Sequence, residues 1–373
     1  MIESRQPLIS TPRAALVVLG MHRSGTSALT RVLNLLGAAL PKNLMPPGPG
    51  NELGHWEPIR VAELHDEILC SVGSGWNALK GPDAAWFDSP QVAAYVEKIR
   101  EIVRREYFAA PLIVIKDPRL SLLFPLWARA LDDLGIACKP IVALRNPLEV
   151  AQSLCLRDRW EQADVEWRID RAGLLALHYN LSAERWTRSH RRVFFHFDDL
   201  LQDWRASMRR LGAEFDIAWP NWSEGTEMAI DAFLRPSHRH HNASDALAKD
   251  SEVWVESIAP VYQALLEACA GRPIDPALFD QFRVAYSRAY NMFSRCFDDK
   301  LSTQQVIEER NRSVQRLERQ IALLTGSTSW RMTAPLRRIV EGLRGWRDGL
   351  GRIEAPPRPL ASAFKTFQVE PAE

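Results

Sequence analysis

The sequence predicts an α/β fold with three layers, in which a mostly parallel β-sheet lies between two layers of helices. Short apolar segments rich in β-branched residues are typical of buried strands. They alternate along the chain with longer segments in which apolar residues recur at helical spacing, and this alternation favours parallel strands joined by helices. The predicted strands cover residues 14–19, 112–115, 140–144 and 193–197.

The composition is typical of a folded globular protein. Of the 373 residues, 46% are hydrophobic and 25% are charged, and the formal net charge is +1. A balance so close to neutral argues against a nucleic-acid partner, so any anion site must be local. The five cysteines have no paired spacing, and the first apolar run leads into a glycine-rich loop instead of forming a signal peptide. Both features predict a cytoplasmic protein with reduced thiols.

The first predicted strand runs directly into a glycine-bracketed loop, Gly20-Met21-His22-Arg23-Ser24-Gly25-Thr26-Ser27. A helix is predicted next, because apolar residues recur at helical spacing up to Gly37. A strand, a glycine-rich loop and a helix in succession point backbone N–H groups and a helix N-terminus at an anion. Arg23 adds a planar charge, and Thr26 and Ser27 add hydroxyl groups. The loop is therefore predicted to bind phosphate.

This loop is close to a Walker A loop but departs from it at one position. Walker A requires Gly-x-x-x-x-Gly-Lys-Ser/Thr. The glycines match at Gly20 and Gly25, but Thr26 stands at the lysine position, and the positive charge comes from Arg23. No apolar segment ends in a clear magnesium-binding aspartate. The sequence therefore predicts phosphate binding without a metal partner.

A second motif, Arg145-Asn146-Pro147-Leu148-Glu149-Val150-Ala151-Gln152-Ser153-Leu154, follows the strand predicted over 140–144. Arg145 lies at the carboxyl end of that strand, where ligands of open α/β sheets bind. Ser153 follows about two helical turns later and can face the same side. This stretch resembles the 3′-phosphate motif of sulfotransferases that use 3′-phosphoadenosine-5′-phosphosulfate (PAPS) as donor. The earlier loop resembles the 5′-phosphosulfate loop of the same family, and the resemblance covers about residues 14–240.

The resemblance to sulfotransferases implies how the donor is held. The 5′-phosphosulfate would be bound by the first loop, namely by Gly20, His22, Arg23, Ser24, Gly25, Thr26 and Ser27. Arg145 and Ser153 would grip the 3′-phosphate. In this family a basic loop late in the domain closes over the nucleotide, and Arg235, Arg239 and His240 are the candidates for that loop. The alternative is that these three residues form a solvated basic loop.

The resemblance also implies two residues that stabilise charge during transfer. Cytosolic sulfotransferases carry a Lys-x-His stretch, in which the lysine acts at the sulfate and the histidine is the general base. Lys116 matches that lysine and follows the strand predicted over 112–115. Together with Arg23, it would stabilise the leaving oxygen.

The histidine of that stretch is replaced here by Pro118, so another general base is required. Glu57 is the first candidate, because Gly54-His55-Trp56-Glu57 resembles a Gly-x-x-Glu stretch of bacterial sulfotransferases. His55, Asp66 and Asp117 are the alternatives for the general base. The competing interpretation of Glu57 is an acid in a solvated loop.

The last quarter of the chain differs in character from the α/β domain, which is predicted over residues 1–300. Residues 301–325 show apolar positions at heptad spacing and predict a short helix capable of a marginal coiled coil. Residues 326–373 predict a basic amphipathic helix followed by a Pro-rich disordered tail. The segment 301–350 is expected to lie on the inner face of a membrane or to contact a partner subunit, with packing on its own domain as the alternative.

Taken with the resemblance, the sequence predicts a sulfotransferase that moves a sulfuryl group from PAPS to an acceptor hydroxyl. The expected acceptor is a carbohydrate or surface-polysaccharide precursor, by analogy with similar tails on bacterial polysaccharide enzymes. No metal is expected. Two alternatives stay open: a P-loop kinase that uses ATP and magnesium on a small metabolite, and a catalytically inactive relative that serves as a binding or scaffold protein.

Overall fold

The structure, a computed structural model, describes residues 13–48, 54–107, 110–160, 169–234 and 251–292, all within the unit Met1–Ser302. The predicted heptad helix 301–325, the segment 326–373 and the loop residues Arg235, Arg239 and His240 lie outside these ranges. Among the described helices, none is long and apolar enough to cross a membrane.

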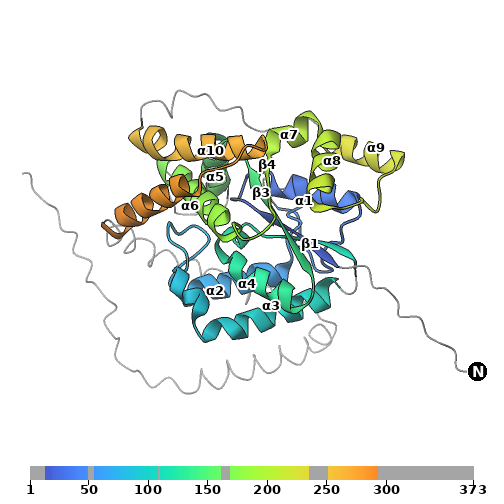
Figure 1. Cartoon of the computed structure of the whole chain (residues 1–373), viewed down its shortest axis with the longest axis horizontal. Coiled ribbons are helices and arrows are strands. Elements are labelled where there is room, and N and C mark those ends of the chain that lie inside the picture. Colours follow the sequence, from blue (N-terminus) through green and yellow to red (C-terminus); the bar gives the residue numbers. More distant parts are fainter. Residues whose placement is uncertain (1–12, 49–53, 108–109, 161–168, 235–250, 293–373) are drawn as a thin grey trace, which may run out of the picture. The chain divides into compact units, whose positions relative to one another are not determined.

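A four-stranded, entirely parallel sheet forms the centre of the fold (Figure 1). Its strands are β1 (Ala14–Leu19), β2 (Leu112–Lys116), β3 (Ala137–Leu144) and β4 (Val193–His196), in the spatial order β2-β1-β3-β4. Val18 of β1 is in register with Lys116 on one side and with Ile141 on the other. The parallel arrangement confirms the predicted sheet.

The strand order places the loop after β1 at the switch point of the sheet. The chain passes from β1 to β2 on one side and then crosses to β3 on the other side. In open parallel sheets such a reversal creates a crevice at the carboxyl ends of the strands, and ligands bind there. The predicted phosphate loop therefore lies where the topology provides a ligand site.

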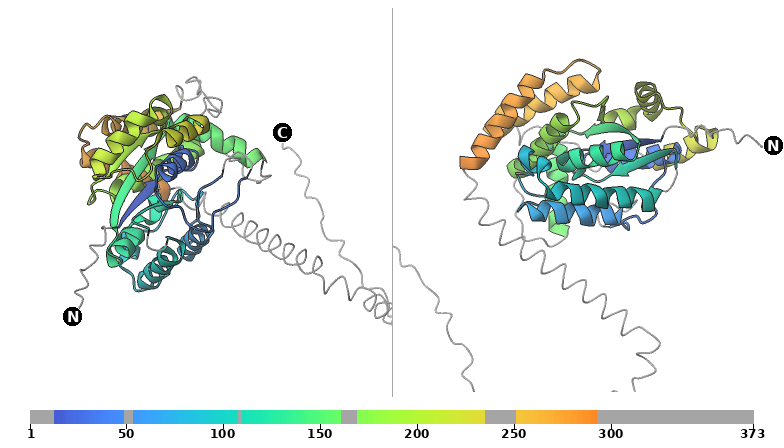
Figure 2. Two further views of the ribbon diagram at one scale, coloured as in Figure 1. Left: turned by 90° about the vertical axis from the view of Figure 1, so that its right-hand side faces the viewer. Right: turned by 60° about the horizontal axis from the view of Figure 1, so that its bottom comes forward.

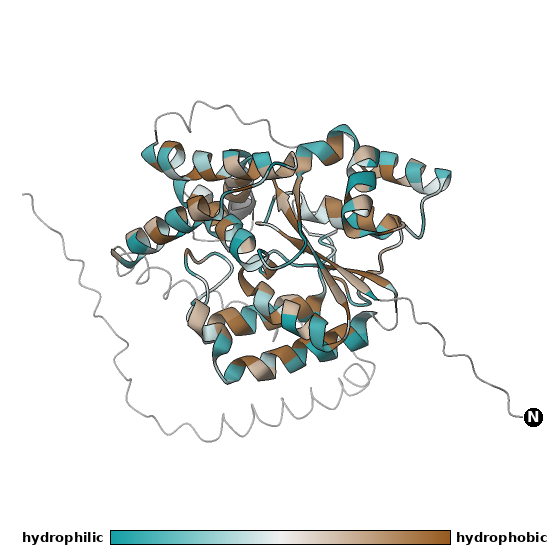
Figure 3. Ribbon diagram, viewed as in Figure 1, coloured by the Kyte–Doolittle hydropathy of each residue, from teal (hydrophilic) through white to brown (hydrophobic). Residues whose placement is uncertain are grey.

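Helices cover both faces of the sheet, which confirms the predicted three layers (Figures 2 and 3). Successive strand residues point to opposite faces, so Leu16 and Val18 join one core cluster while Ala15 and Val17 join the other. The first cluster is covered by α1 (Thr26–Leu35), α7 (Phe197–Gln202), α8 (Trp204–Phe215) and α9 (Glu224–Phe233). The second is covered by α2 (Ile59–Ser71), α3 (Gln91–Tyr107), α4 (Leu120–Asp133), α5 (Pro147–Trp160), α6 (Ile169–Trp186) and α10 (Ala259–Cys269).

Three strands differ in length from the prediction. β2 ends at Lys116, one residue later than predicted. β3 begins at Ala137, three residues before the predicted apolar run, because Ala137–Lys139 pair with the start of β1 although they are not fully buried. β4 ends at His196, one residue early. The His196 Nδ1 atom accepts the N–H of Asp198 at 3.2 Å, and this side-chain cap begins α7 at Phe197.

Shorter helical turns, η1 (Ala84–Asp88) and η4 (Trp254–Ile258), and a helix over 276–292 complete the described chain.

The contact between Gly25 and Phe197 allows a direct test of the loop geometry. Gly25 has a φ of 80°, and a Cβ atom there would overlap the Phe197 ring. We expect Gly25→Ala to lower the free energy of unfolding by more than about 2 kcal/mol, from the left-handed backbone and the clash together. The measurement is urea denaturation followed by circular dichroism.

Gly225→Ala is the matched control, because Gly225 lies in α9 and a Cβ atom there meets nothing within 4 Å. This substitution should raise stability by up to about 1 kcal/mol. Equal stability of the two variants would contradict the packing of Phe197 on the loop.

Candidate functional site

The loop after β1 is held in an unusual backbone conformation by close contacts. Gly20 has a φ of 145°, and a Cβ atom there would lie 2.7 Å from the Ala143 carbonyl oxygen of β3. The Gly20 N–H donates to the buried Ser121 hydroxyl at 2.9 Å. Arg23 has a φ of 70°, a left-handed conformation that non-glycine residues seldom adopt and that clusters at functional sites.

The N-terminus of α1 completes an anion-binding shape. Its N-cap residue is Gly25, which has no side chain to accept the N–H groups of the first turn. Thr26 and Ser27 contribute the first N–H groups of that turn, at the positive end of the helix dipole. These are the features by which a strand, a loop and a helix bind a phosphate group.

The structure brings the two predicted phosphate motifs into direct contact. The Arg23 Nε atom donates to the Ser153 Oγ atom at 2.7 Å, although the two residues are 130 positions apart. The Arg145 Nη1 atom donates to the Arg23 carbonyl oxygen at 3.1 Å. Arg23, Arg145 and Ser153 therefore form one polar cluster beside the loop.

Arg145 is fixed in this cluster by two further contacts. Its Nε atom donates to the Glu149 carboxylate at 2.8 Å, and its guanidinium lies 5.3 Å from the centre of the Phe197 ring. The buried Nη2 atom lies 2.8 Å from the same carboxylate but has no aligned hydrogen bond among the described residues. An N–H group on Nη2 and the Ser153 hydroxyl hydrogen are thus available to a ligand, and both suit a phosphate.

A second polar cluster lies on the other side of the loop, around Lys116. The buried Lys116 ammonium donates to Ser27 Oγ at 3.0 Å and to the His55 carbonyl oxygen at 3.0 Å, and it forms an ion pair with Glu57. Glu57 is only 5% exposed, so it is not a solvated loop acid. The three side chains come from α1, β2 and the segment before α2, and Ser27 joins them to the loop.

The alternative bases Asp117 and Asp66 lie in a different, buried cluster around Arg119. Asp117 is 0% exposed and accepts from the Arg119 Nε and Nη2 atoms at 2.8 and 2.7 Å. Asp66 pairs with Arg119 Nη1 at 2.6 Å. Burial alone would raise the pKa of Asp117, but the adjoining Arg119 guanidinium and His65 hold that pKa well below its usual range.

The ring of His65 is neutral in this cluster. The Trp127 indole N–H donates to His65 Nε2 at 2.7 Å, and an indole can only donate, so Nε2 carries no proton. Nδ1 therefore carries the proton and donates to Asp117 at 3.0 Å. Asp117 also accepts the Arg119 backbone N–H at 2.9 Å, so the cluster fixes the turn from β2 into α4.

The remaining loop residues predicted to hold the donor differ in their surroundings. His22 packs the edge of its ring against Trp76, with the ring centres 4.9 Å apart, and also approaches Tyr179. Ser24 and Thr26 are buried, and the Ser24 N–H donates to the Met21 carbonyl oxygen at 3.2 Å. The His22 ring thus lies beside Tyr179 of α6.

Several residues that shape the site could not be recognised from the sequence. Phe197 packs on both Gly25 and Arg145, and Ser121 accepts from Gly20, but neither residue belongs to a recognisable motif. Glu149 lies inside the second motif, in the first turn of α5, and its position four residues after Arg145 could have indicated the ion pair. Among the described residues, no group of three or more His, Cys, Asp or Glu side chains could hold a metal ion.

Comparisons with known proteins give structural matches only. No protein-family model and no curated protein matches the sequence. The structure is similar to the sulfotransferase domain of the Synechococcus PCC 7002 olefin synthase, with 16% identity and a TM-score of 0.38, covering 70% of this chain and 98% of that one. It is also similar to the sulfotransferase domain from the curacin biosynthetic pathway, with 13% identity and a TM-score of 0.37, covering 70% and 99%.

A third match is sulfotransferase STF1 from Mycobacterium tuberculosis, with 14% identity and a TM-score of 0.35, covering 70% of this chain and 78% of that one. All three structures carry the name of the family that the two phosphate motifs resemble.

The buried charge on Asp117 predicts a pH-dependent stability. Because its pKa is depressed in the folded state, Asp117 stabilises the fold at neutral pH, and this contribution is lost as the pH falls below the ordinary value of 3.8. We expect Asp117→Asn to cost about 3–5 kcal/mol at pH 7, since it leaves Arg119 without its buried partner. The difference from the unmodified protein should shrink in strongly acidic solution.

Asp216→Asn is the control, because Asp216 forms an exposed ion pair with Arg191. Its effect should stay within about 0.5 kcal/mol at any pH. Chemical denaturation at pH 7 and at pH 3 measures both variants, and a cost for Asp117→Asn that does not depend on pH would contradict the assignment.

Proposed function

We propose that this protein is a sulfotransferase that uses PAPS as its donor. The observation that carries the proposal is the contact of the two phosphate motifs, in which Arg23 donates to Ser153 and Arg145 donates to the Arg23 carbonyl oxygen. A nucleotide with phosphate groups on both its 5′ and 3′ positions requires two adjacent anion sites. The loop at the start of α1 supplies one site, and the Arg145–Ser153 cluster supplies the other.

The donor fits the groups that the two sites offer. The N–H groups at the start of α1 and the Arg23 guanidinium would hold the 5′-phosphosulfate. The N–H on the buried Arg145 Nη2 atom and the Ser153 hydroxyl would hold the 3′-phosphate. A nucleoside triphosphate would leave this second site without a partner, and Thr26 supplies no charge where kinases of the Walker type have lysine.

The transfer step follows from the cluster around Lys116. An acceptor hydroxyl attacks sulfur, so that an O–S bond forms while the bond from sulfur to the bridging oxygen of the 5′-phosphate breaks. The bridging oxygen keeps the electron pair, and Glu57 takes the hydroxyl proton. Lys116 and Arg23 stabilise the charge on the leaving oxygen, each contribution being worth about 3–4 kcal/mol.

The arrangement of Lys116 sets a condition for this step. In the structure its ammonium group donates to Ser27, to the His55 carbonyl oxygen and to Glu57, which uses all three of its N–H groups. Lys116 must therefore exchange one of these partners for the leaving oxygen. Ser27 is the partner nearest the bound 5′ group, because it lies in the first turn of α1.

The identity of the acceptor and the place of action are proposed from the sequence alone. We propose a carbohydrate hydroxyl as the acceptor, a cytoplasmic location, and contact of the segment 301–350 with a membrane surface or a second subunit. The support is the basic amphipathic pattern of that segment and its likeness to tails of polysaccharide enzymes.

Calorimetric titration with 3′-phosphoadenosine-5′-phosphate, in the presence of a metal chelator, tests the donor site. Arg145→Gln combined with Glu149→Gln removes the guanidinium without leaving a buried carboxylate unpaired. We expect this double variant to lose at least about tenfold in affinity for the bisphosphate, because charged hydrogen bonds to the 3′-phosphate are lost. Its affinity for AMP should change by less than about twofold.

Glu149→Gln alone is the matched control and should keep the preference for the bisphosphate over AMP. Equal losses for the two nucleotides would refute the assignment of the 3′ site. Binding of ATP with magnesium, without binding of the bisphosphate, would favour a kinase instead.

Glu57→Gln tests the general base. We expect it to lower turnover by about 10²–10⁴-fold with whichever acceptor in a panel of simple sugars and phenols supports sulfation, while bisphosphate affinity changes by less than about threefold. Glu67→Gln is the control, since Glu67 forms an exposed pair with Lys98 on α2 and α3. Turnover that survives in Glu57→Gln would assign the base to another residue, and absence of turnover with every acceptor would favour the scaffold hypothesis.

A further inference from the structure

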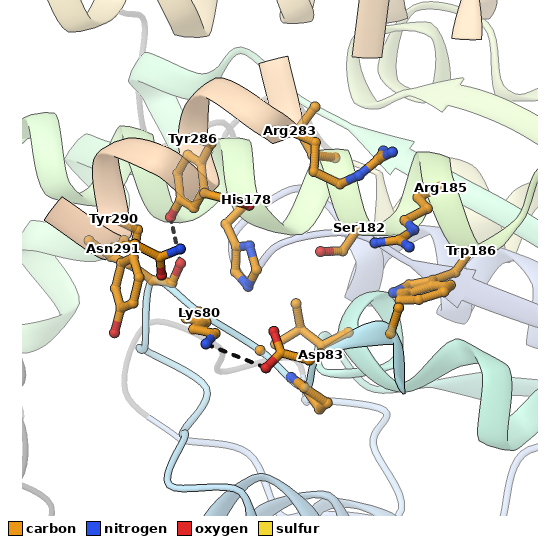
Figure 4. Close-up of a pocket in the computed structure, with 17 residues that line it drawn as sticks. Lys80, Asp83, His178, Ser182, Arg185, Trp186, Arg283, Tyr286, Tyr290 and Asn291 are labelled. Carbon is orange, nitrogen blue, oxygen red and sulfur yellow. Dashed lines mark hydrogen bonds and ion pairs between the residues drawn. The ribbon is translucent and has the colours of Figure 1, made fainter. Parts of the chain in front are cut away.

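A cavity of about 150 Å³ lies apart from the two phosphate clusters, between α6, the segment Leu79–Ala84 and the helix over 276–292 (Figure 4). One part of its lining is apolar and includes Leu79, Pro82, Leu122 and Leu181. Another part is polar and includes His178, Ser182, Arg185 and Arg283. A volume of this size accommodates a single six-membered ring.

The polar side of the cavity carries excess positive charge. Arg185 and Arg283 extend into the same side of the cavity (Figure 4). Arg188 and Arg192 lie close by. Among the described residues, the ion pairs of these arginines involve two carboxylates: Glu184 pairs with Arg188 and Arg192, and Asp280 pairs with Arg188 and Arg283. The lining also includes the carboxylate of Asp83, which pairs with Lys80. Burial, together with the neighbouring Arg283, lowers the pKa of Arg185 from its usual value. An anion in the cavity would relieve this repulsion.

Two of the arginines offer N–H groups to such an anion. The buried Arg283 Nη1 atom has no hydrogen-bond partner among the described residues. The Arg185 guanidinium packs 4.4 Å from the centre of the Trp186 ring. Among the described residues it forms no ion pair, and the nearby Asp280 only partly offsets the repulsion from Arg283 and Arg188. Paired guanidinium groups match the planar geometry of a carboxylate.

His178 provides a neutral hydrogen-bonding group in the same cavity. Its ring stacks on Tyr286, with the ring centres 5.6 Å apart and the planes 7° from parallel. Burial lowers the pKa of His178 to about 4, so the ring is uncharged at neutral pH. Its buried Nε2 atom has no hydrogen-bond partner in the described part of the chain, and an unmet polar atom of this kind suits a hydroxyl group of a ligand.

We propose that this cavity binds a small aromatic carboxylate, with the carboxylate directed at Arg185 and Arg283 and a ring hydroxyl directed at His178. The apolar lining would enclose the ring, and the excess arginine charge would be balanced by the ligand. The ligand site involves none of the residues that hold the donor, so the inference does not depend on the proposed function.

Calorimetric titration of the full chain with three matched probes tests the proposal. 4-Hydroxybenzoate should bind with a Kd below about 1 mM. 4-Hydroxybenzamide has the same shape without the charge, and benzoate lacks the hydroxyl. We expect the amide to bind at least about tenfold more weakly and benzoate about threefold to tenfold more weakly.

Two variants remove the two preferences separately. Arg185→Gln should abolish the preference for the acid over the amide. His178→Phe keeps a ring against Tyr286 and should abolish the preference for 4-hydroxybenzoate over benzoate. Arg105→Gln, at an exposed ion pair with Glu101 on α3, is the control and should change neither preference.

The affinity of Arg185→Gln for 3′-phosphoadenosine-5′-phosphate should equal that of the unmodified protein, which separates this result from any failure of the donor assignment. Equal binding of the acid and the amide by the unmodified protein would overturn the proposal. So would a result in which each variant keeps the preference that it was designed to remove. Binding of D-glucuronate in place of the aromatic acid would also overturn it, because the ligand would then belong to a different class.

Discussion

The hydrogen bond from Arg23 to Ser153 joins the two halves of the candidate site. It connects a loop after β1 with a helix that follows β3, and it forms because these two strands are neighbours whose carboxyl ends lie together. Arg145 adds a second link from the end of β3 to the Arg23 carbonyl oxygen. Arg23 has a left-handed backbone, its side chain contacts Ser153 of α5, and its carbonyl oxygen contacts Arg145 after β3. If β1 and β3 were not neighbours, the two motifs would not be in contact.

Buried charge in this protein follows two different patterns. Around Asp117, the side chains of Arg119, His65 and Trp127 form a network in which each of these nitrogen and oxygen atoms has a protein partner among the described residues. Around Arg145 and in the cavity beside α6, buried donors remain unmet within the described residues. A closed network stabilises one conformation, whereas unmet buried donors carry a desolvation cost that a bound anion would offset. By this contrast, the charged residues around Asp117 stabilise the fold, whereas Arg145 and the arginines of the cavity are candidates for binding a ligand.

The sequence was sufficient to predict the parallel sheet, its three layers and the convergence of both motifs, because apolar segments and glycine-bracketed turns are local signals. It was not sufficient for contacts that depend on side-chain packing across the fold. The packing of Phe197 on Gly25 could be recognised only in the tertiary structure. The same holds for Glu57, which pairs with Lys116 instead of being exposed in a loop. Likewise, Asp117 looked like a possible base because it adjoins Lys116, but consecutive strand-end residues point to opposite sides, and Asp117 turns to His65 and Arg119.

The segment between Trp76 and Ala84 connects the loop after β1 with the cavity beside α6. Trp76 packs against His22 of the loop, and its carbonyl oxygen accepts the Tyr179 hydroxyl at 2.7 Å. Three residues later, the Leu79 carbonyl oxygen accepts the Tyr286 hydroxyl at 2.8 Å. Tyrosines from α6 and from the helix over 276–292 thus fix both ends of a short stretch, whose continuation lines the cavity. Because Tyr179 and His178 are adjacent on α6, one helix turn approaches His22 of the loop after β1 through Tyr179 and lines the cavity through His178.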